Sequence, residues 1–185
     1  MHWADYTAQR LMERGDEQVS ASGITPSGEF HIGHLREILS AEMIHRACLD
    51  AGMSSKYIFI VDSMDPLRRV YDFLSPEYEE FIGCPLAYIP APDEDGSPGN
   101  GSVTYADHFL SPFLDSLEQI GVRPEVVMNH ETYERGLFAE YIDSAITNRE
   151  EIRRIIQQIS GRELPHDWFP YNPMGSGGSM DGVTV

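Results

Sequence analysis

Apolar residues recur with regular spacing in the first third of the chain. From about Gly33 to Ala51 they return at intervals of three and four, which predicts an amphipathic helix closed by Gly52. The run Lys56-Tyr-Ile-Phe-Ile-Val61 then predicts a strand buried on both faces. A strand over Gln18 to Ile24 precedes the helix, so the order is strand, loop, helix, strand. This order predicts a βαβ unit of a parallel sheet.

The rest of the chain continues the alternation of strands and helices. Asp62 to Tyr71 is predicted as a strand-end loop leading into a short helix. Further helices are predicted at 2–14, 105–120, 137–147 and 150–159, and a third strand at 124–129. The sequence therefore predicts an α/β fold with a mostly parallel sheet flanked by helices.

Turn-forming residues divide the chain into one main domain and a tail. Residues 1–173 carry the periodic segments and are predicted to form that domain. Within it, a stretch near 85–102 is rich in proline, glycine and acidic residues, which predicts an exposed insertion loop. Residues 174–185 include Gly175-Ser-Gly-Gly-Ser179 and are predicted to be a flexible linker or tail.

The charge balance narrows the class of partner. Thirteen basic residues against 30 acidic ones give a net charge of −17, and Lys56 is the single lysine. Such a surface repels phosphate backbones, so DNA is not expected as a partner. No apolar run approaches the roughly 20 residues needed to cross a bilayer, and no basic-then-apolar leader opens the chain. We therefore expect a cytoplasmic protein without membrane contact. Two cysteines, Cys48 and Cys84, are too few for a disulfide framework.

The segment from Ser22 to His34 is the strongest candidate for chemistry. It lies where a predicted strand ends and a helix begins, and ligands of parallel sheets bind at that edge. His31 and His34 stand three apart on the first turn, where unpaired N–H groups favour anions such as phosphates. Gly33 leaves room for a base or ribose, Gly23 allows a tight turn, and two hydroxyls lie nearby, on Thr25 and Ser27.

Plainer readings of these residues stay open. A histidine pair at this spacing is often a surface feature, and a metal site would need a third ligand that is not evident nearby.

Asp62, Asp65 and Arg68 follow a predicted strand, so they also face the ligand edge of the sheet. They would suit an ammonium group and a carboxylate or phosphate. Alternatively, Asp65 caps a helix before Pro66 and Arg68 pairs with an acidic neighbour.

Longer motifs point to a family. His31-Ile-Gly-His34 matches the HIGH signature of class I aminoacyl-tRNA synthetases. The wider text Ser22-Gly-Ile-Thr-Pro-Ser-Gly28 resembles class I lysyl-tRNA synthetases of the archaeal type. Further stretches that resemble this family are His2-Trp-Ala-Asp5, Asp62-Ser-Met-Asp-Pro-Leu-Arg68, Tyr105-Ala-Asp-His-Phe109 and Gly161-Arg-Glu-Leu-Pro165. The likeness extends from His2 to about Pro173.

The resemblance implies a Rossmann-type catalytic domain that activates lysine with ATP and passes the lysyl group to tRNA(Lys). Magnesium is implied as the usual companion of ATP. By matching position, His31 and His34 would contact the phosphates and stabilise the transition state. The ATP site would also include Thr25, Ser27 and Gly33. The amino-acid pocket would include Gly23, Thr25, Asp62, Asp65 and Arg68.

The sequence also departs from the family pattern. The second signature, KMSKS, needs two lysines, so that loop and the anticodon-binding domain are not expected in this chain. No cysteine pair follows Pro173, so zinc is not expected there. The chain is then a fragment, an engineered deletion or a natural short paralogue. Two other functions stay open: a small-molecule nucleotidyltransferase, and a non-catalytic paralogue that binds ATP or lysine.

Overall fold

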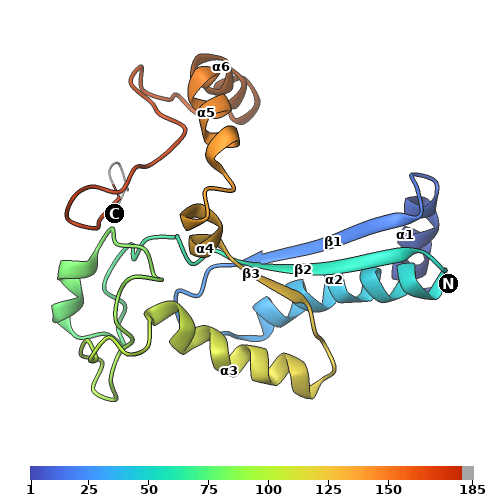
Figure 1. Cartoon of the computed structure of the whole chain (residues 1–185), viewed down its shortest axis with the longest axis horizontal. Helices are drawn as coiled ribbons and strands as arrows, with labels where there is room; N and C mark the ends of the chain where they lie inside the picture. The colour runs from blue at the N-terminus through green and yellow to red at the C-terminus, as the bar shows by residue number, and fades with distance from the viewer. Residues whose placement is uncertain (181–185) are drawn as a thin grey trace.

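A computed structural model of the chain describes residues 1–180 (Figure 1). In chain order, its elements are α1 (Trp3–Met12), β1 (Glu17–Ile24), α2 (Ile32–Asp50), β2 (Ser54–Val61), the 3-10 helix η1 (Pro76–Phe81), α3 (Tyr105–Gln119), β3 (Glu125–Met128), α4 (Asn129–Glu134), α5 (Ala139–Thr147) and α6 (Arg149–Ser160). None of the described helices is long and apolar enough to cross a membrane.

The three strands form one parallel sheet in the order β1-β2-β3. Gly23 pairs with Ile60, and Val61 with Met128, so the carboxyl ends of all three strands meet at one edge. Helices α2 and α3 connect successive strands and lie on the same face of the sheet (Figure 1). The predicted α/β fold with a parallel sheet is confirmed.

The main core lies between the sheet and these two helices. Phe59 and Val61 on β2 are fully buried and meet Ile38 from α2 and Phe113 from α3. Phe59 packs edge-to-face on Phe113, with ring centroids 6.3 Å apart. Burying such side chains contributes about 1.5–3 kcal/mol each. This packing fixes the strand ends and the start of α2, on which the candidate site is built.

The prediction that β2 is buried on both faces is wrong. Burial alternates along the strand: Tyr57, Phe59 and Val61 are buried, whereas Ile58 and Ile60 are only partly covered. On the neighbouring strand and the same face as Ile58, Val19 is 64% exposed. Helices α2 and α3 cover only one face of the sheet. The apolar run of β2 therefore places Phe59 and Val61 in the core, whereas Ile58 and Ile60 lie on the opposite face, which the described residues cover only in part.

One segment agrees with its predicted form and another differs from it. Asp62 to Tyr71 is a loop of turns and bridges, and it leads to the short helix η1 at Pro76–Phe81. The stretch 85–102 is not exposed throughout, because Leu86 and Ile89 are buried in a second apolar cluster with Tyr78 and Tyr105. Prolines and acidic residues suggested solvent exposure, but apolar residues between them pack inward. Helix α4, which is only six residues long, was not predicted.

Gly96, within the stretch 85–102, packs closely against the segment that precedes η1. Its backbone lies at φ +82, and an added Cβ would stand 2.5 Å from the Phe73 carbonyl oxygen. We expect Gly96→Ala to lower the free energy of unfolding by about 2 kcal/mol or more. The matched change is Gly101→Ala, where φ is +77 and nothing lies within 4 Å; it should cost about 1 kcal/mol. Urea unfolding measures both, and equal losses would contradict the proposed contact.

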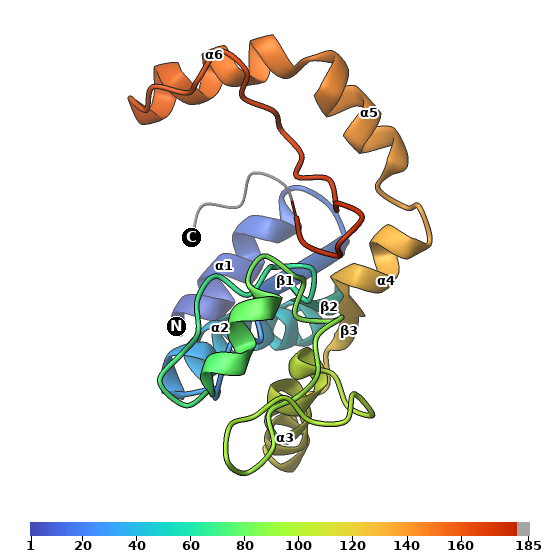
Figure 2. The ribbon, with the colours of Figure 1, turned by 90° about the vertical axis from the view of Figure 1, so that its left-hand side faces the viewer.

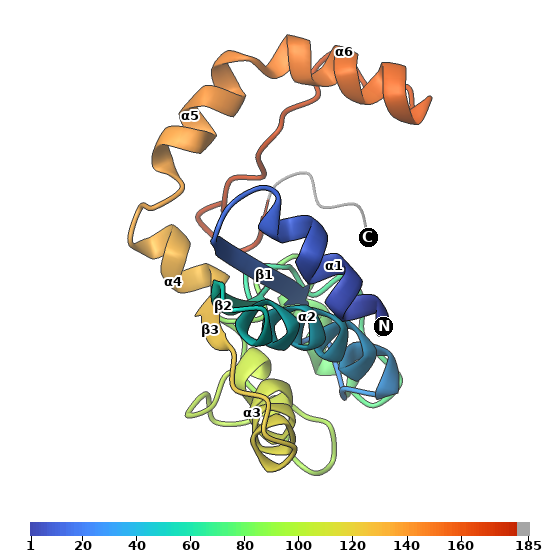
Figure 3. The same cartoon turned by 90° about the vertical axis from the view of Figure 1, so that its right-hand side faces the viewer.

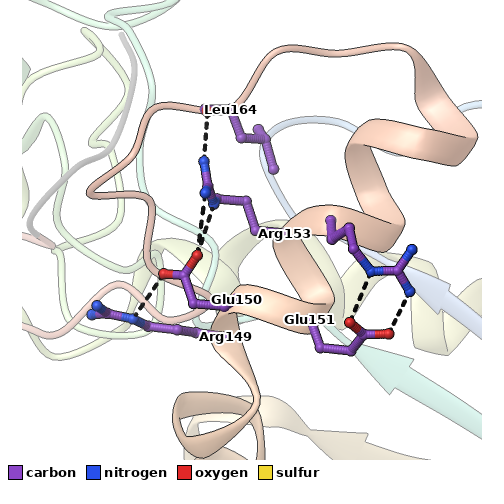
Figure 4. Close-up of polar contacts among 6 residues, drawn as sticks. Arg149, Glu150, Glu151, Arg153 and Leu164 are labelled. Atoms are coloured by element: carbon purple, nitrogen blue, oxygen red, sulfur yellow. Dashed lines mark hydrogen bonds and ion pairs between the residues drawn. The ribbon is translucent and has the colours of Figure 1, made fainter.

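After β3 the chain forms an arm that rises from the sheet and then returns. Figures 2 and 3 show α4, α5 and α6 leading away from the strands and the following segment running back toward them. Arg153 of α6 bonds Glu150 and, at 3.5 Å, the Leu164 carbonyl of the returning segment (Figure 4). Farther on, the Met180 N–H donates to the Gly83 carbonyl at 2.8 Å. Of the predicted linker 174–185, residues 174–180 form a turn against the body, and 181–185 lie outside the described residues.

Candidate active site at the carboxyl edge of the sheet

Two histidines cap the N-terminus of α2. His31 is the cap residue, and its Nδ1 accepts the Gly33 N–H at 3.0 Å. His34 Nδ1 in turn accepts the His31 N–H at 3.0 Å, and the two ring centroids lie 4.0 Å apart. Because both Nδ1 atoms act as acceptors, each neutral ring carries its proton on Nε2. The pair therefore presents two N–H donors beside a helix N-terminus, which suits phosphate oxygens.

The pKa of His34 supports the neutral form. Burial lowers this pKa, nearby His31 lowers it further, and the Glu37 carboxylate partly opposes both effects. A neutral His34 keeps its Nδ1 free to accept the His31 N–H. Protonation would place a hydrogen on Nδ1 and break that cap. The capping geometry and the lowered pKa thus favour the same tautomer.

Gly33 has a role that sequence reasoning did not find. An added Cβ would stand 2.7 Å from His31 Cε1 and 2.9 Å from its Nδ1. The His31 ring thus lies directly against Gly33, and the approach of a base or ribose to this glycine stays a prediction. The glycine is needed here because it lets the ring lie over the helix end and accept its N–H.

We expect Gly33→Ala to displace the His31 ring and release its capping bond. Nitrogen-15 NMR of the imidazoles should then show His31 as a mixture of tautomers instead of a single Nε2–H form. Gly28→Ala is the matched change, because a Cβ there meets Phe73 only at an ordinary 3.5 Å. A single unchanged tautomer in Gly33→Ala would contradict the steric argument.

Acidic side chains gather at the ends of β1 and β2. The Thr25 hydroxyl donates to Asp65 Oδ2 at 2.7 Å, and the Gly23 N–H donates to Glu37 Oε1 at 3.1 Å. Asp62 lies beside them: burial raises the pKa of its carboxyl group, and the charges of Asp65 and Glu37 raise it further. The loop after β2 and helix α2 therefore bring three carboxylates together at the ligand edge of the sheet.

A cavity of about 830 Å³ opens at this edge. Asp62, Asp65 and Arg68 line it, so the structure brings together three of the predicted amino-acid-binding residues. The residues that complete the wall come from the loop after β2, from α4 and α5, and from the returning segment; they include Tyr88, Asn129, Tyr133, Trp168 and Tyr171. Its walls are partly aromatic and partly acidic, which suits a cation with an aliphatic stem.

The remaining predicted residues lie beside the cavity instead of in its wall. Thr25 is joined to the cavity wall through its bond to Asp65, whereas Gly23 bonds Glu37, which is not among the cavity-lining residues. The Ser27 carbonyl accepts the Tyr105 hydroxyl at 2.8 Å and ties the loop to α3. His31 is exposed and His34 half-buried, and neither is among the cavity-lining residues. Asp65 caps no helix, because it accepts the Thr25 hydroxyl instead.

Two site residues were missed by sequence reasoning. Glu37 lies one turn after His34 on α2, and its charge acts on both His34 and Asp62. Asn129 follows β3 directly and donates from Nδ2 to Asp62 Oδ1 at 2.7 Å. The signal for Asn129 was present, since a polar residue after a parallel strand lies at the same edge as those after its neighbours. Glu37 had no such signal beyond its helical spacing.

Comparison with known proteins identifies the family. A family model described as tRNA synthetases class I (K) matches residues 1–185. The chain belongs to this family. A lysine–tRNA ligase of Archaeoglobus fulgidus is 44% identical over 94% of the chain, and lysine–tRNA ligase 1 of Methanosarcina acetivorans is 42% identical over the same share. The lysine–tRNA ligase of Picrophilus torridus is 40% identical over 100% of the chain.

The chain spans about a third of the length of these relatives, from 31% to 35%. Membership in the class I (K) synthetases agrees with the parallel sheet and with the position of the histidine pair at α2. Within residues 1–180, no group of three or more histidine, cysteine or acidic side chains is arranged to hold a metal ion.

Proposed function

We propose that this chain binds lysine and ATP and catalyses lysine activation, the first step of a lysine–tRNA ligase reaction. The observation that carries the proposal is the Asp62 carboxylate in the cavity wall, whose pKa is raised first by burial and then by the charges of Asp65 and Glu37, with no cation of the described residues among the causes. An ammonium group would supply that cation. The relatives are named lysine–tRNA ligases, which makes lysine the matching substrate.

In the proposed reaction, the lysine carboxylate attacks the α-phosphorus of ATP. A new C–O–P linkage forms lysyl-adenylate, and the bond to the β-phosphate oxygen breaks to release pyrophosphate. Asp62 and Asp65 would hold an ammonium group of lysine, and Arg68 would orient its carboxylate. The Nε2–H groups of His31 and His34 would donate to phosphate oxygens as charge builds during displacement. Glu37 would connect both halves, because its charge reaches His34 and Asp62.

Residues 1–173 would carry this chemistry. Transfer of the lysyl group to tRNA(Lys) is proposed for the longer relatives, with tRNA as the partner. The net charge of −17 opposes docking of a phosphate backbone on this chain alone. The activation step needs no such docking, so it is the step to test.

The decisive experiment is ATP–pyrophosphate exchange by this chain with each of the twenty amino acids in turn. We expect exchange with lysine and not with the others. Nucleotide transfer to an acceptor other than an amino acid would instead support a small-molecule nucleotidyltransferase. Binding of ATP and lysine without any exchange would support a non-catalytic paralogue.

Lysine binding should weaken in acid at a higher pH than an ordinary aspartate would produce. Only ionised Asp62 attracts an ammonium, and its pKa is raised above 3.8 by burial, Asp65 and Glu37. As pH falls through this raised pKa, the carboxylate takes up a proton and loses its attraction. Calorimetric titration with lysine over a series of pH values measures the midpoint. In Asp62→Asn that midpoint should disappear, and its persistence would contradict the assignment.

A further inference from the structure

A groove outside the large cavity is lined by residues that have no role in the proposed reaction. Two cavities, of about 600 and 320 Å³, adjoin each other through Glu29, His108 and Phe109, which line both. The larger lies between α3 and the loop that precedes it, and the smaller lies between α3 and the residues just before α2, where Phe30 also contacts His34. Figures 1 and 2 show these segments on the side of the molecule opposite to α5 and α6. We call these two cavities together the α3 groove.

The floor of the α3 groove is aromatic. Phe73 is 48% exposed, and its ring meets Phe109 edge-to-face with centroids 5.6 Å apart. Farther along, Phe30 stacks on Phe113 at 4.3 Å, and Pro112 lies beside them. An exposed aromatic side chain on a firmly packed floor is the kind of anchor that dominates protein–protein interfaces.

The rim of the α3 groove is acidic. Glu29, Asp93 and Glu94 line it, and all three side chains are exposed. None of them has an ion pair with another residue of the described range 1–180. Of the described residues that line the groove, only His108 carries a basic group. The rim therefore offers negative charge that the chain does not neutralise itself.

Hydrogen bonds within the chain hold the loop that carries Asp93 and Glu94 in place. The Ser75 N–H donates to the Gly96 carbonyl at 2.9 Å, and the Asp93 N–H donates to the Ser97 carbonyl at the same distance. Gly96 also packs on the Phe73 backbone, as described above. A preformed wall lowers the entropy lost on binding.

From these features we infer that the α3 groove docks a cationic polypeptide segment in which Arg or Lys alternates with apolar residues. The apolar side chains contact Phe73 and Phe109, and the basic side chains reach Glu29, Asp93 and Glu94. Charge complementarity selects this occupant, because the same rim repels the phosphates of nucleic acids. Two adjoining cavities suit an extended segment better than one small cation.

A labelled peptide of alternating arginine and leucine tests the inference by fluorescence anisotropy with the intact chain. We expect binding that weakens with added salt. The double change Asp93→Asn with Glu94→Gln should lower affinity about fivefold. The matched double change is Asp16→Asn with Glu17→Gln, which removes the same charge from exposed residues at the start of β1 and should leave affinity nearly unchanged.

A second pair of variants tests the aromatic floor. Phe73→Ala should lower peptide affinity about tenfold, whereas Trp3→Ala, which removes an aromatic ring of similar exposure on α1, should not. Equal losses in both acidic pairs, or no loss in Phe73→Ala, would show attraction by net charge alone and overturn the inference. Competition by spermine at equal concentration, or by single-stranded RNA, would overturn it in favour of a small cation or a nucleic acid. Thermal unfolding of each variant establishes that it is folded.

Discussion

Replacing His34 by alanine is expected to lower lysine-dependent ATP–pyrophosphate exchange by about two to three orders of magnitude. The change removes an Nε2–H donor aimed at developing phosphate charge. It also removes the Nδ1 acceptor of the His31 backbone N–H, so the hydrogen bond that joins the two histidines is lost. Lysine affinity, measured separately by calorimetry, should change little, because Asp62 and Asp65 are untouched.

His45→Ala is the matched control for this experiment. His45 also lies on helix α2, but far from its first turn. Its Nδ1 forms a hydrogen bond of 2.8 Å with the Ser55 hydroxyl. Its removal should leave exchange near the starting rate. His34→Ala should also lose about 1 kcal/mol of stability through the cap, which urea unfolding measures. Normal exchange in folded His34→Ala would refute the proposed role of the pair.

Asp62→Asn is expected to weaken lysine binding about a hundredfold while making the free protein more stable at neutral pH. The lost affinity follows from removing the charge that an ammonium would pair with. The stability gain follows from linkage. Because the folded pKa of Asp62 is raised, its stabilising contribution is present below the ordinary pKa of 3.8 and is lost as pH rises through the folded pKa. Asparagine does not ionise, so it avoids this loss.

Thermal unfolding at neutral and acid pH separates the two effects. The stability advantage of Asp62→Asn should shrink as the pH falls and Asp62 itself becomes protonated. Asp72→Asn is the matched change at an exposed aspartate outside the cavity, and it should alter neither lysine binding nor stability. Unchanged lysine affinity in Asp62→Asn would refute the proposed ammonium site, whatever its effect on stability.

Local pattern was enough to predict much of the fold. The spacing of apolar residues in α2 and the apolar run of β2 predicted the βαβ order, because each reports how one element buries its own face. The same run could not show whether one or two faces are covered, since Ile58 and Ile60 depend on which helices pack against the sheet. Helices α5 and α6 of the arm were predicted and α4 was not. The direction of the arm away from the sheet depends on contacts that no local pattern contains.

The residues of the candidate site likewise include some that local pattern predicts and others that it does not. Asp62, Asp65 and Arg68 were predictable because a residue that follows a parallel strand must lie at the ligand edge. Glu37, Asn129 and the wall formed by Trp168 and Tyr171 come from other elements, so only their packing in three dimensions revealed them. For Gly33 the prediction concerned an incoming base and stays a prediction, and the structure adds a second reason for the glycine, which is room for the His31 ring.

The returning segment after α6 determines when the wall of the large cavity is completed during synthesis. Trp168, Tyr171 and Met180 complete the wall of the large cavity, although Asp62 and Asp65, which follow β2, lie more than a hundred residues earlier. During synthesis on a ribosome, the histidine pair and these acidic residues emerge first, and Trp168 and Tyr171 emerge last. A nascent chain stalled before Pro165 would therefore expose these acidic residues to solvent and lack a closed compartment for a small cation.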